Sequence, residues 1–298
     1  MGNANEGSSM TQISAATRGN PAPVTQIDHA RAGAVTPAMR AVAEKEGRDP
    51  EFIREGVAAG RIAIPANIHH ASLIPEGVGG GLRTKVNVNL GISGDVACEA
   101  EEWKKVDVAL ELGAEAIMDL SNSGKTAAFR RALIEKSPAM IGTVPLYDAI
   151  GYLEKPLVGI TAADFLDVVR AHAEDGVDFV TIHAGMNRRT IESFRETGRL
   201  TNIVSRGGSL IFAWMEATGN ENPFYEFYDE VLAILHEHVE GRVVAQALLQ
   251  PHVRRYLVEC HVAGALHHHL HARIPRALRE LAHLDELGYL GRVGGVVG

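Results

Sequence analysis

Cysteine is scarce in this sequence of 298 residues, which contains only Cys98 and Cys260. Two cysteines cannot build the disulfide framework of a secreted protein, so we expect a reducing, cytoplasmic environment. The sequence has no apolar run near the roughly 18 residues of a membrane span, and its first residues lack the pattern of a signal peptide. Basic charge is not in excess, because the formal net charge is −8. We therefore expect no binding to membranes or nucleic acids.

The composition divides the chain into four segments. Residues 1–35 are rich in small and polar residues, and we expect them to form a flexible arm. Residues 36–83 are predicted to form two short helices and an extended segment, with Thr36 as the cap of the first helix. Residues 84–238 alternate strand and helix patterns, and residues 239–298 form an atypical, His-rich helical tail.

Residues 84–238 contain five runs that are predicted to be strands, each followed by a segment with helical spacing. Strands that alternate with helices form a parallel sheet, and near-continuous apolar runs indicate that both faces are covered. The expected fold class is therefore α/β, of the (β/α)8 TIM-barrel type, but incomplete, because the remaining residues are too few for three more units. The predicted strands are Thr84–Gly91, Ala114–Ser121, Ala139–Tyr147, Asp178–Gly185 and Thr201–Gly208.

Polar or small residues end each predicted strand, and sites in such folds form at the carboxyl ends of strands. His183, at the end of "DFVTIHAG", is the most reactive of them. A strand-end histidine is more often a structural hydrogen-bonding residue than a catalyst. The convergence of five strand ends on one rim is what favours a functional site here.

Two further motifs indicate a functional site less strongly than this rim. The loop "NSGKT" (Asn122 to Thr126) lacks the first glycine of a P-loop, so nucleotide hydrolysis is not favoured, although a helix N-terminus there could hold a phosphate. His69 and His70 are adjacent on an extended segment, so their side chains should point in opposite directions and not share a metal ion.

Six short motifs follow one another in the chain: "RIAIPANIHH", "KVNVNLGIS", "MDLS", "IGTVPLYDA", "TIHAG" and "IVSRGGS". Together they resemble the phosphomethylpyrimidine synthase (ThiC) family of thiamine biosynthesis. The resemblance implies a radical S-adenosylmethionine lyase with a [4Fe–4S] cluster, a divalent metal (zinc) site and a homodimer. It implies conversion of aminoimidazole ribotide into 4-amino-5-hydroxymethyl-2-methylpyrimidine phosphate. A related branch, which the motifs also resemble, makes the cobalamin precursor 5-hydroxybenzimidazole from the same ribotide.

The resemblance also implies which residues contact the ribotide at the strand ends. His183 is in addition the candidate catalytic residue, since an imidazole can transfer a proton near neutral pH. Ser205 and its neighbours open a helix, where backbone N–H groups and a cation suit a phosphate. The implied substrate-binding residues are Asn89, Met118, Tyr147, His183, Ser205, Arg206 and Gly207.

The sequence departs from the family pattern after His238. A [4Fe–4S] cluster needs three or four thiolates, which two cysteines cannot supply. We therefore expect no metal-ligating residues in this chain, and no residues of its own for the cluster, S-adenosylmethionine or zinc. A hypothesis of another class follows from this departure, namely a non-catalytic module that binds a ribotide or a protein partner.

Overall fold

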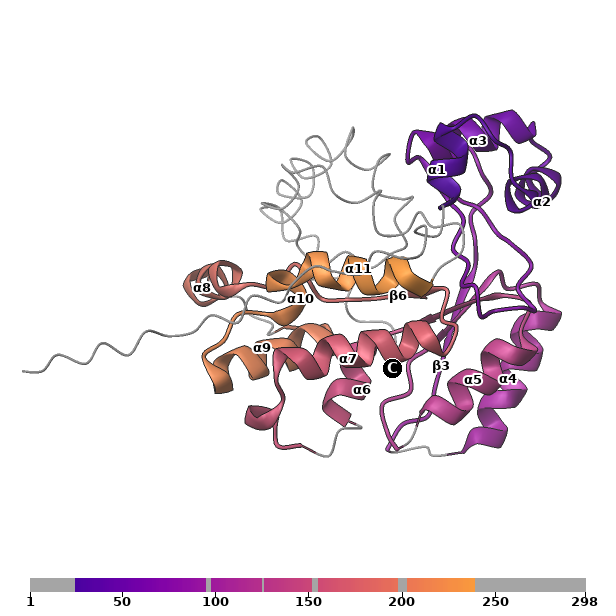
Figure 1. The fold of residues 1–298 in the computed structure, drawn as a ribbon. Helices are drawn as coiled ribbons and strands as arrows, with labels where there is room; N and C mark the ends of the chain where they lie inside the picture. The colour runs from indigo at the N-terminus through magenta and orange to yellow at the C-terminus, as the bar shows by residue number, and fades with distance from the viewer. Residues whose placement is uncertain (1–24, 95–97, 125, 152–154, 198–202, 239–298) are drawn as a thin grey trace, which may run out of the picture.

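The computed structural model describes residues 25–94, 98–124, 126–151, 155–197 and 203–238. The arm up to residue 24 and the His-rich tail from residue 239, both predicted from composition, lie outside the described residues. The described chain forms a small helical unit at its N-terminal end and a larger α/β body (Figure 1). None of its helices is long and apolar enough to cross a membrane.

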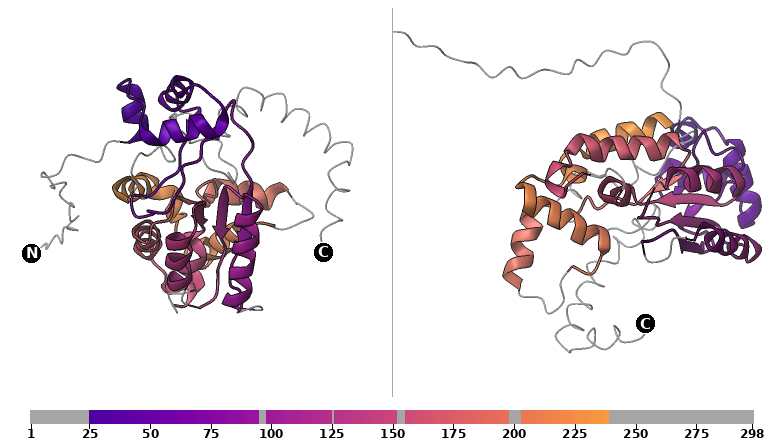
Figure 2. Two further views of the ribbon diagram at one scale, coloured as in Figure 1. Left: turned by 90° about the vertical axis from the view of Figure 1, so that its right-hand side faces the viewer. Right: turned by 90° about the horizontal axis from the view of Figure 1, so that it is seen from below.

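The N-terminal unit consists of three helices and one pair of very short antiparallel strands, β1 (Ile62–Ala63) and β2 (Val78–Gly79). Its own buried apolar cluster includes Met39, Ile53 and Ile62. In Figure 1 and the left view of Figure 2, these helices lie above the helices that flank the sheet. The three helices are α1 (Gln26–Arg31), α2 (Pro37–Glu46) and α3 (Pro50–Ala58).

Helix α1 corrects the predicted flexible arm, which was expected to reach residue 35. Thr25 and Asp28 form a capping box: the Thr25 hydroxyl accepts the Asp28 N–H at 3.1 Å, and the Asp28 carboxylate accepts the Thr25 N–H at 3.0 Å. Ile27 and Ala30 are buried. A helix of six residues is too short to show a periodic pattern in the sequence, which is why composition alone was misleading. The predicted cap of α2 by Thr36 is confirmed.

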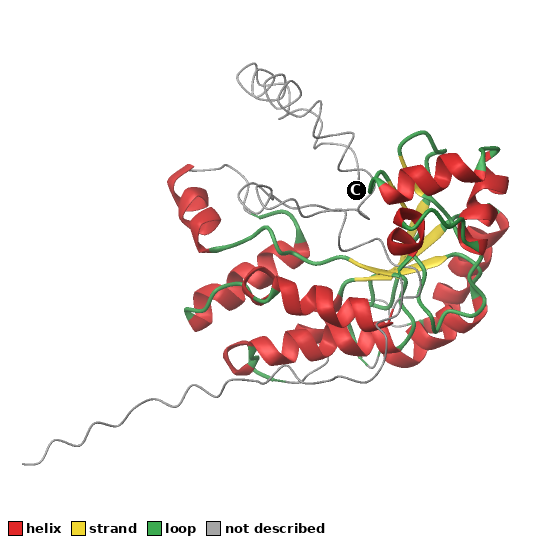
Figure 3. Ribbon diagram, turned by 45° about the horizontal axis from the view of Figure 1, so that its top comes forward, coloured by secondary structure: helices red, strands yellow, loops and turns green. Residues whose placement is uncertain are grey.

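The α/β body contains one parallel sheet of four strands in the order β3-β4-β5-β6. Consecutive strands are neighbours, as in a (β/α) barrel, and the described residues form part of such an arrangement. The predicted fold class is confirmed. Figure 3 shows the strands in yellow, bordered by red helices. The strands are β3 (Asn87–Leu90), β4 (Ala116–Asp119), β5 (Met140–Thr143) and β6 (Phe179–Val180).

Alternate strand residues pack into two different hydrophobic clusters, as the pleat requires. Ile117 and Ile141 pack with residues of the flanking helices α4 (Glu99–Glu111) and α5 (Ala127–Lys136). Met118 instead belongs to a larger cluster built from the later helices. The later helical elements are α6 (Pro145–Gly151), the 3-10 turn η1 (Leu157–Gly159), α7 (Ala162–Glu174), α8 (Arg188–Thr197), α9 (Arg206–Thr218), α10 (Pro223–Glu226) and α11 (Tyr228–His238).

Two strand predictions are corrected by the structure. The described part of the predicted fifth strand, residues 203–208, is not a strand: Val204 is 83% exposed and Ser205 caps α9. Its β-branched residues pair with no strand of the described sheet, and β propensity depends on such pairing. The third strand ends at Thr143, and Tyr147 lies in α6, because Pro145 has no N–H for a sheet ladder and begins a helix instead.

Candidate functional site

His183 and Ser205, which lie on separate predicted motifs, contact each other in the structure. The Nε2 atom of His183 is 3.1 Å from the Ser205 hydroxyl oxygen. His183 follows β6 and is 6% exposed, while Ser205 caps α9 by accepting the Gly208 N–H at 3.2 Å. The hydroxyl can donate to an unprotonated Nε2 or accept from a protonated one. The orientation of the ring is thus coupled to the start of α9.

Gly207 permits this close approach of the imidazole to α9. A Cβ atom at position 207 would lie 2.0 Å from Cε1 of His183, a distance that real side chains do not tolerate. Glycine at this position is therefore required by packing, and not by backbone conformation. It lets the ring lie directly against the first turn of the helix.

We expect Gly207→Ala to displace the His183 ring, since the new methyl group would overlap it. The cost in the free energy of unfolding should be about 1–3 kcal/mol, measured by denaturant unfolding. Gly94→Ala is a matched control, because a Cβ at position 94 would meet only Ser123 Oγ, at 3.9 Å. Equal stability of the two variants would contradict the tight packing at Gly207.

Tyr147 and Arg206 form a second contact at the same helix end. The guanidinium carbon of Arg206 lies 5.5 Å from the centre of the Tyr147 ring, within the range of a cation–π interaction. Burial raises the pKa of the Tyr147 phenol, and the positive charge of Arg206 only partly offsets this effect. The phenol therefore stays protonated at neutral pH and can donate a hydrogen bond.

These residues form one group around the N-terminus of α9, which we call the α9 cluster. They come from α6, from the loop after β6 and from the first turn of α9, and were all predicted as substrate contacts. The α9 cluster consists of Tyr147, His183, Ser205, Arg206 and Gly207.

The other two predicted contacts, Asn89 and Met118, lie on the sheet next to this cluster. They are direct neighbours in the register of β3 and β4. Met118 is 9% exposed and belongs to the hydrophobic cluster against which Tyr147 packs. Asn89 is exposed, and its side-chain oxygen accepts a hydrogen bond from Asn87 at 3.1 Å. Met118 is thus linked to the α9 cluster by packing, whereas Asn89 lies one strand further away.

Asn222 contacts the site and was not predicted from the sequence. Its side-chain amide nitrogen donates to the backbone carbonyls of His183, at 2.6 Å, and Met186, at 2.7 Å. Its side-chain oxygen accepts the Phe224 N–H and so caps α10. The sequence "NP" at the start of a helix signals only the cap. The second role depends on a contact between residues 39 and 36 positions apart, which no local pattern reveals.

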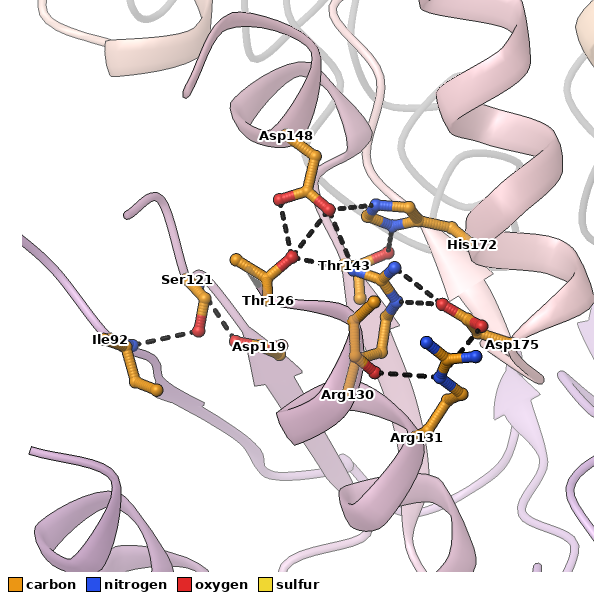
Figure 4. A network of polar contacts seen from close by, with 11 residues as sticks. Ile92, Asp119, Ser121, Thr126, Arg130, Arg131, Thr143, Asp148, His172 and Asp175 are labelled. Carbon is orange, nitrogen blue, oxygen red and sulfur yellow. Dashed lines mark hydrogen bonds and ion pairs between the residues drawn. The ribbon is translucent and has the colours of Figure 1, made fainter. Parts of the chain in front are cut away.

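A buried polar network supports α6, the helix that carries Tyr147 (Figure 4). The Asp148 carboxylate accepts hydrogen bonds from the Thr126 hydroxyl at 2.7 Å, from Arg130 at 2.9 Å and from Nε2 of His172 at 2.9 Å. Arg130 also donates through two nitrogens to Asp175, at 2.9 and 2.6 Å. The network joins α5, α6 and α7 behind the carboxyl end of β5.

The charge states in this network follow from its contacts. Burial lowers the pKa of His172, so its ring is neutral, with Nε2–H donating to Asp148 and Nδ1 accepting from the Thr143 hydroxyl at 2.8 Å. Burial opposes ionisation of Asp148, but the hydrogen bonds from His172 and Thr126 and the charge of Arg130 outweigh it and lower its pKa. Arg130 is therefore the cation that balances the buried Asp148 and the partly buried Asp175.

The loop after β4 is fixed by a separate set of contacts, also visible in Figure 4. Asp119 ends β4, and its carboxylate accepts the Ser121 N–H at 2.9 Å. The Ser121 hydroxyl in turn accepts the Ile92 N–H at 2.9 Å, which ties this loop to the one after β3. Burial raises the pKa of Asp119. The adjacent P-loop-like segment uses Thr126 in the Asp148 network, and Lys125 lies outside the described residues.

The residues of this chain do not fit an iron–sulfur cluster. Cys98 is exposed, Cys260 lies outside the described residues, and the whole sequence has only these two thiols. A [4Fe–4S] cluster needs three or four. The described part of the chain also has no group of three or more His, Cys, Asp or Glu side chains that could hold a metal ion.

Comparisons with known proteins agree with the motifs. The model of the radical SAM ThiC family matches residues 25–243. A phosphomethylpyrimidine synthase of Alkaliphilus metalliredigens is 62% identical over 214 residues, which are 72% of this chain and 49% of that protein. The enzymes of that name from Clostridium tetani and Campylobacter jejuni are 59% and 58% identical over 72% and 70% of this chain, and over 47% and 49% of their own lengths. The chain spans about half the length of the curated relatives it matches.

Proposed function

The chain belongs to the radical SAM ThiC family, and from this membership we propose that it binds aminoimidazole ribotide at the α9 cluster. The observation that carries the proposal is the meeting of five residues from three separate segments at one helix end. All five were implied as ribotide contacts by the family resemblance. The name of the relatives favours the pyrimidine product over 5-hydroxybenzimidazole.

The chemistry of the α9 cluster suits a phosphorylated, planar substrate. The first turn of a helix presents backbone N–H groups to an anion, and the exposed Arg206 adds a guanidinium. Ser205 fixes one nitrogen of the His183 ring, so the imidazole has a defined orientation towards a ligand. The Tyr147 phenol adds a hydrogen-bond donor and an aromatic face.

For the complete enzyme we propose the conversion of the ribotide to 4-amino-5-hydroxymethyl-2-methylpyrimidine phosphate, a product that the name of its relatives, phosphomethylpyrimidine synthase, supports. That lyase chemistry would use a [4Fe–4S] cluster and S-adenosylmethionine. The two cysteines of this chain are too few to hold the cluster, so further thiolate ligands would be needed. The alternative function is a ribotide-binding module without catalysis, and the cysteine count is the observation that favours it. Mass analysis of the product after anaerobic reconstitution distinguishes the two products from each other, and product formation distinguishes an enzyme from a binding module.

We expect calorimetric titration with aminoimidazole ribotide to show saturable binding, weakened about 10- to 100-fold by Arg206→Ala. The loss of one charged hydrogen-bond partner of a phosphate has an effect of this size. Arg189→Ala is the matched control, since Arg189 is also an exposed arginine but lies on α8. No binding by the folded wild-type chain, or an equal loss in both variants, would refute the proposed function.

A further inference from the structure

We propose that Asn222 is a positioning residue for His183, because its amide holds the backbone of the loop that presents the imidazole. Asn222 is fully buried, at 0% exposure. The last sheet hydrogen bond before this loop is donated by Thr181 N–H to the Thr143 carbonyl. Beyond it, the carbonyls of His183 and Met186 both accept from the same amide nitrogen of Asn222. One side chain therefore holds both ends of the turn that carries the ring.

The three hydrogen bonds of the Asn222 side chain explain why the residue is asparagine. Capping of α10 needs only an oxygen that accepts the Phe224 N–H, which serine or aspartate would also provide. The two carbonyls need two N–H donors, which a neutral amide provides and a carboxylate or hydroxyl does not. Buried carbonyls without partners are costly, so the loop would rearrange if the amide were lost.

The anchor for this amide is rigid. Phe224, two residues further along, is fully buried and packs edge-on against Phe165, with the two ring centres 5.5 Å apart. The Glu221 carboxylate accepts the Arg188 N–H at 3.2 Å, and the Arg188 guanidinium donates to the Asn220 carbonyl at 3.2 Å. The segment from 220 to 222 is thus fastened to the loop and to the start of α8. Such support limits the movement of the functional group it holds.

Asn222 and Gly207 act on different parts of the same residue. Asn222 fixes the backbone of His183, while Gly207 and Ser205 determine where its ring can lie. A shift of the backbone by a fraction of an ångström would therefore break the contact with Ser205 or drive the ring into α9. Small displacements of this kind have large effects on catalytic and binding geometry.

The test uses Asn222→Ser, which keeps the cap of α10 and removes the two donors. Two properties are measured on the full chain: the ring ¹⁵N signals of His183 by NMR without ligand, and the affinity for aminoimidazole ribotide by calorimetry. We expect the His183 signals to shift and the affinity to fall about tenfold or more. Asn220→Ser is the matched control, because the Asn220 side chain is exposed and the hydrogen bonds of this residue to Arg188 and Thr218 use its backbone.

The affinity measurement rests on the proposed function, whereas the NMR measurement does not. If the wild-type chain does not bind the ribotide, the proposed function fails, and the His183 signals still decide the role of Asn222. A folded Asn222→Ser chain with unchanged His183 signals would overturn the proposal. Should that variant not fold, Asn222→Asp, which keeps both the cap and the volume, replaces it. If neither variant folds, the role of Asn222 is structural and the proposal is also overturned.

Discussion

Arg130→Ala is expected to destabilise the chain by about 3–5 kcal/mol in denaturant unfolding, the usual cost of breaking a buried charge network from one side. The side chain of Arg130 is 3% exposed and balances both Asp148 and Asp175. Its removal leaves the buried Asp148 without its cation and leaves the partly buried Asp175 with only the exposed Arg131. Asp148 would respond by binding a proton, because the charge of Arg130 is one of the causes that keep its pKa low.

Arg131→Ala provides the matched control for this prediction. Arg131 is the next residue on α5 and also faces Asp175, at 3.5 Å, but its side chain is 64% exposed. Exposed ion pairs contribute at most about 1 kcal/mol, so this variant should remain close to the wild type. Similar losses in both variants would mean that the buried network does not stabilise the fold.

The buried network around Arg130 also shows which contacts cannot be predicted from the sequence alone. The capping box of Thr161 and Asp164 follows from a local sequence pattern, because both of its partners lie within one turn. Arg130 and Asp175 are 45 positions apart, and nothing in their local sequences connects them. Long-range polar contacts of this kind depend on how the helices pack, and that information is not present in any short window of the sequence.

The strand predictions show the same difference between local and long-range information. Four of the five predicted strands exist, because a buried parallel strand is an apolar run with its own signature. The run at residues 203–204 has the same composition and is not a strand, since it pairs with no strand of the described sheet. Strand formation is a property of the pair, and helix formation is largely local. The Thr36 cap of α2 was therefore predicted correctly, whereas the fifth strand was not.

The candidate site was accessible from the sequence only through the resemblance of its motifs. Composition and periodicity placed His183 at a strand end, but could not bring Ser205 or Arg206 next to it. The contact of the imidazole with Gly207 is visible only in three dimensions. Asn222 was missed because its local signal, a helix cap, is complete without any contact to the site.

His70 and Asp178 form a buried pair outside the α9 cluster, and their geometry predicts a pH-dependent contribution to stability. Nδ1 of His70 is 2.6 Å from the Asp178 carboxylate, and Nε2 is 2.8 Å from the Ser137 carbonyl. A carbonyl only accepts, so Nε2 carries a proton. Burial raises the pKa of Asp178, but its carboxylate also accepts the N–H groups of Asn67 and Ile141, and these hydrogen bonds and the neighbouring His70 favour its ionised form. The second proton of the imidazole therefore lies on Nδ1.

Burial by itself would lower the pKa of His70, but the hydrogen bond and the charge of Asp178 outweigh burial and raise it above its ordinary value of 6.5. A group with a raised pKa in the folded state binds its proton more tightly there than in the unfolded state. Its contribution to stability is therefore fully present below the unfolded pKa and is lost as the pH rises through the folded pKa. The stabilisation by His70 should decrease from mildly acidic towards alkaline pH.

We expect His70→Ala to lower the free energy of unfolding by about 3 kcal/mol at acidic pH, where it leaves the Asp178 carboxylate buried without its cation. The difference from the wild type should narrow as the pH rises through the raised pKa of His70, without vanishing, because the cavity and the lost hydrogen bonds remain. His69→Ala is the control, since the adjacent His69 is exposed. The measurement is the free energy of unfolding of all three proteins across this pH range. If the difference in this free energy between the wild type and His70→Ala stays constant with pH, the imidazole is neutral in the folded chain, and Asp178 holds it through a hydrogen bond alone.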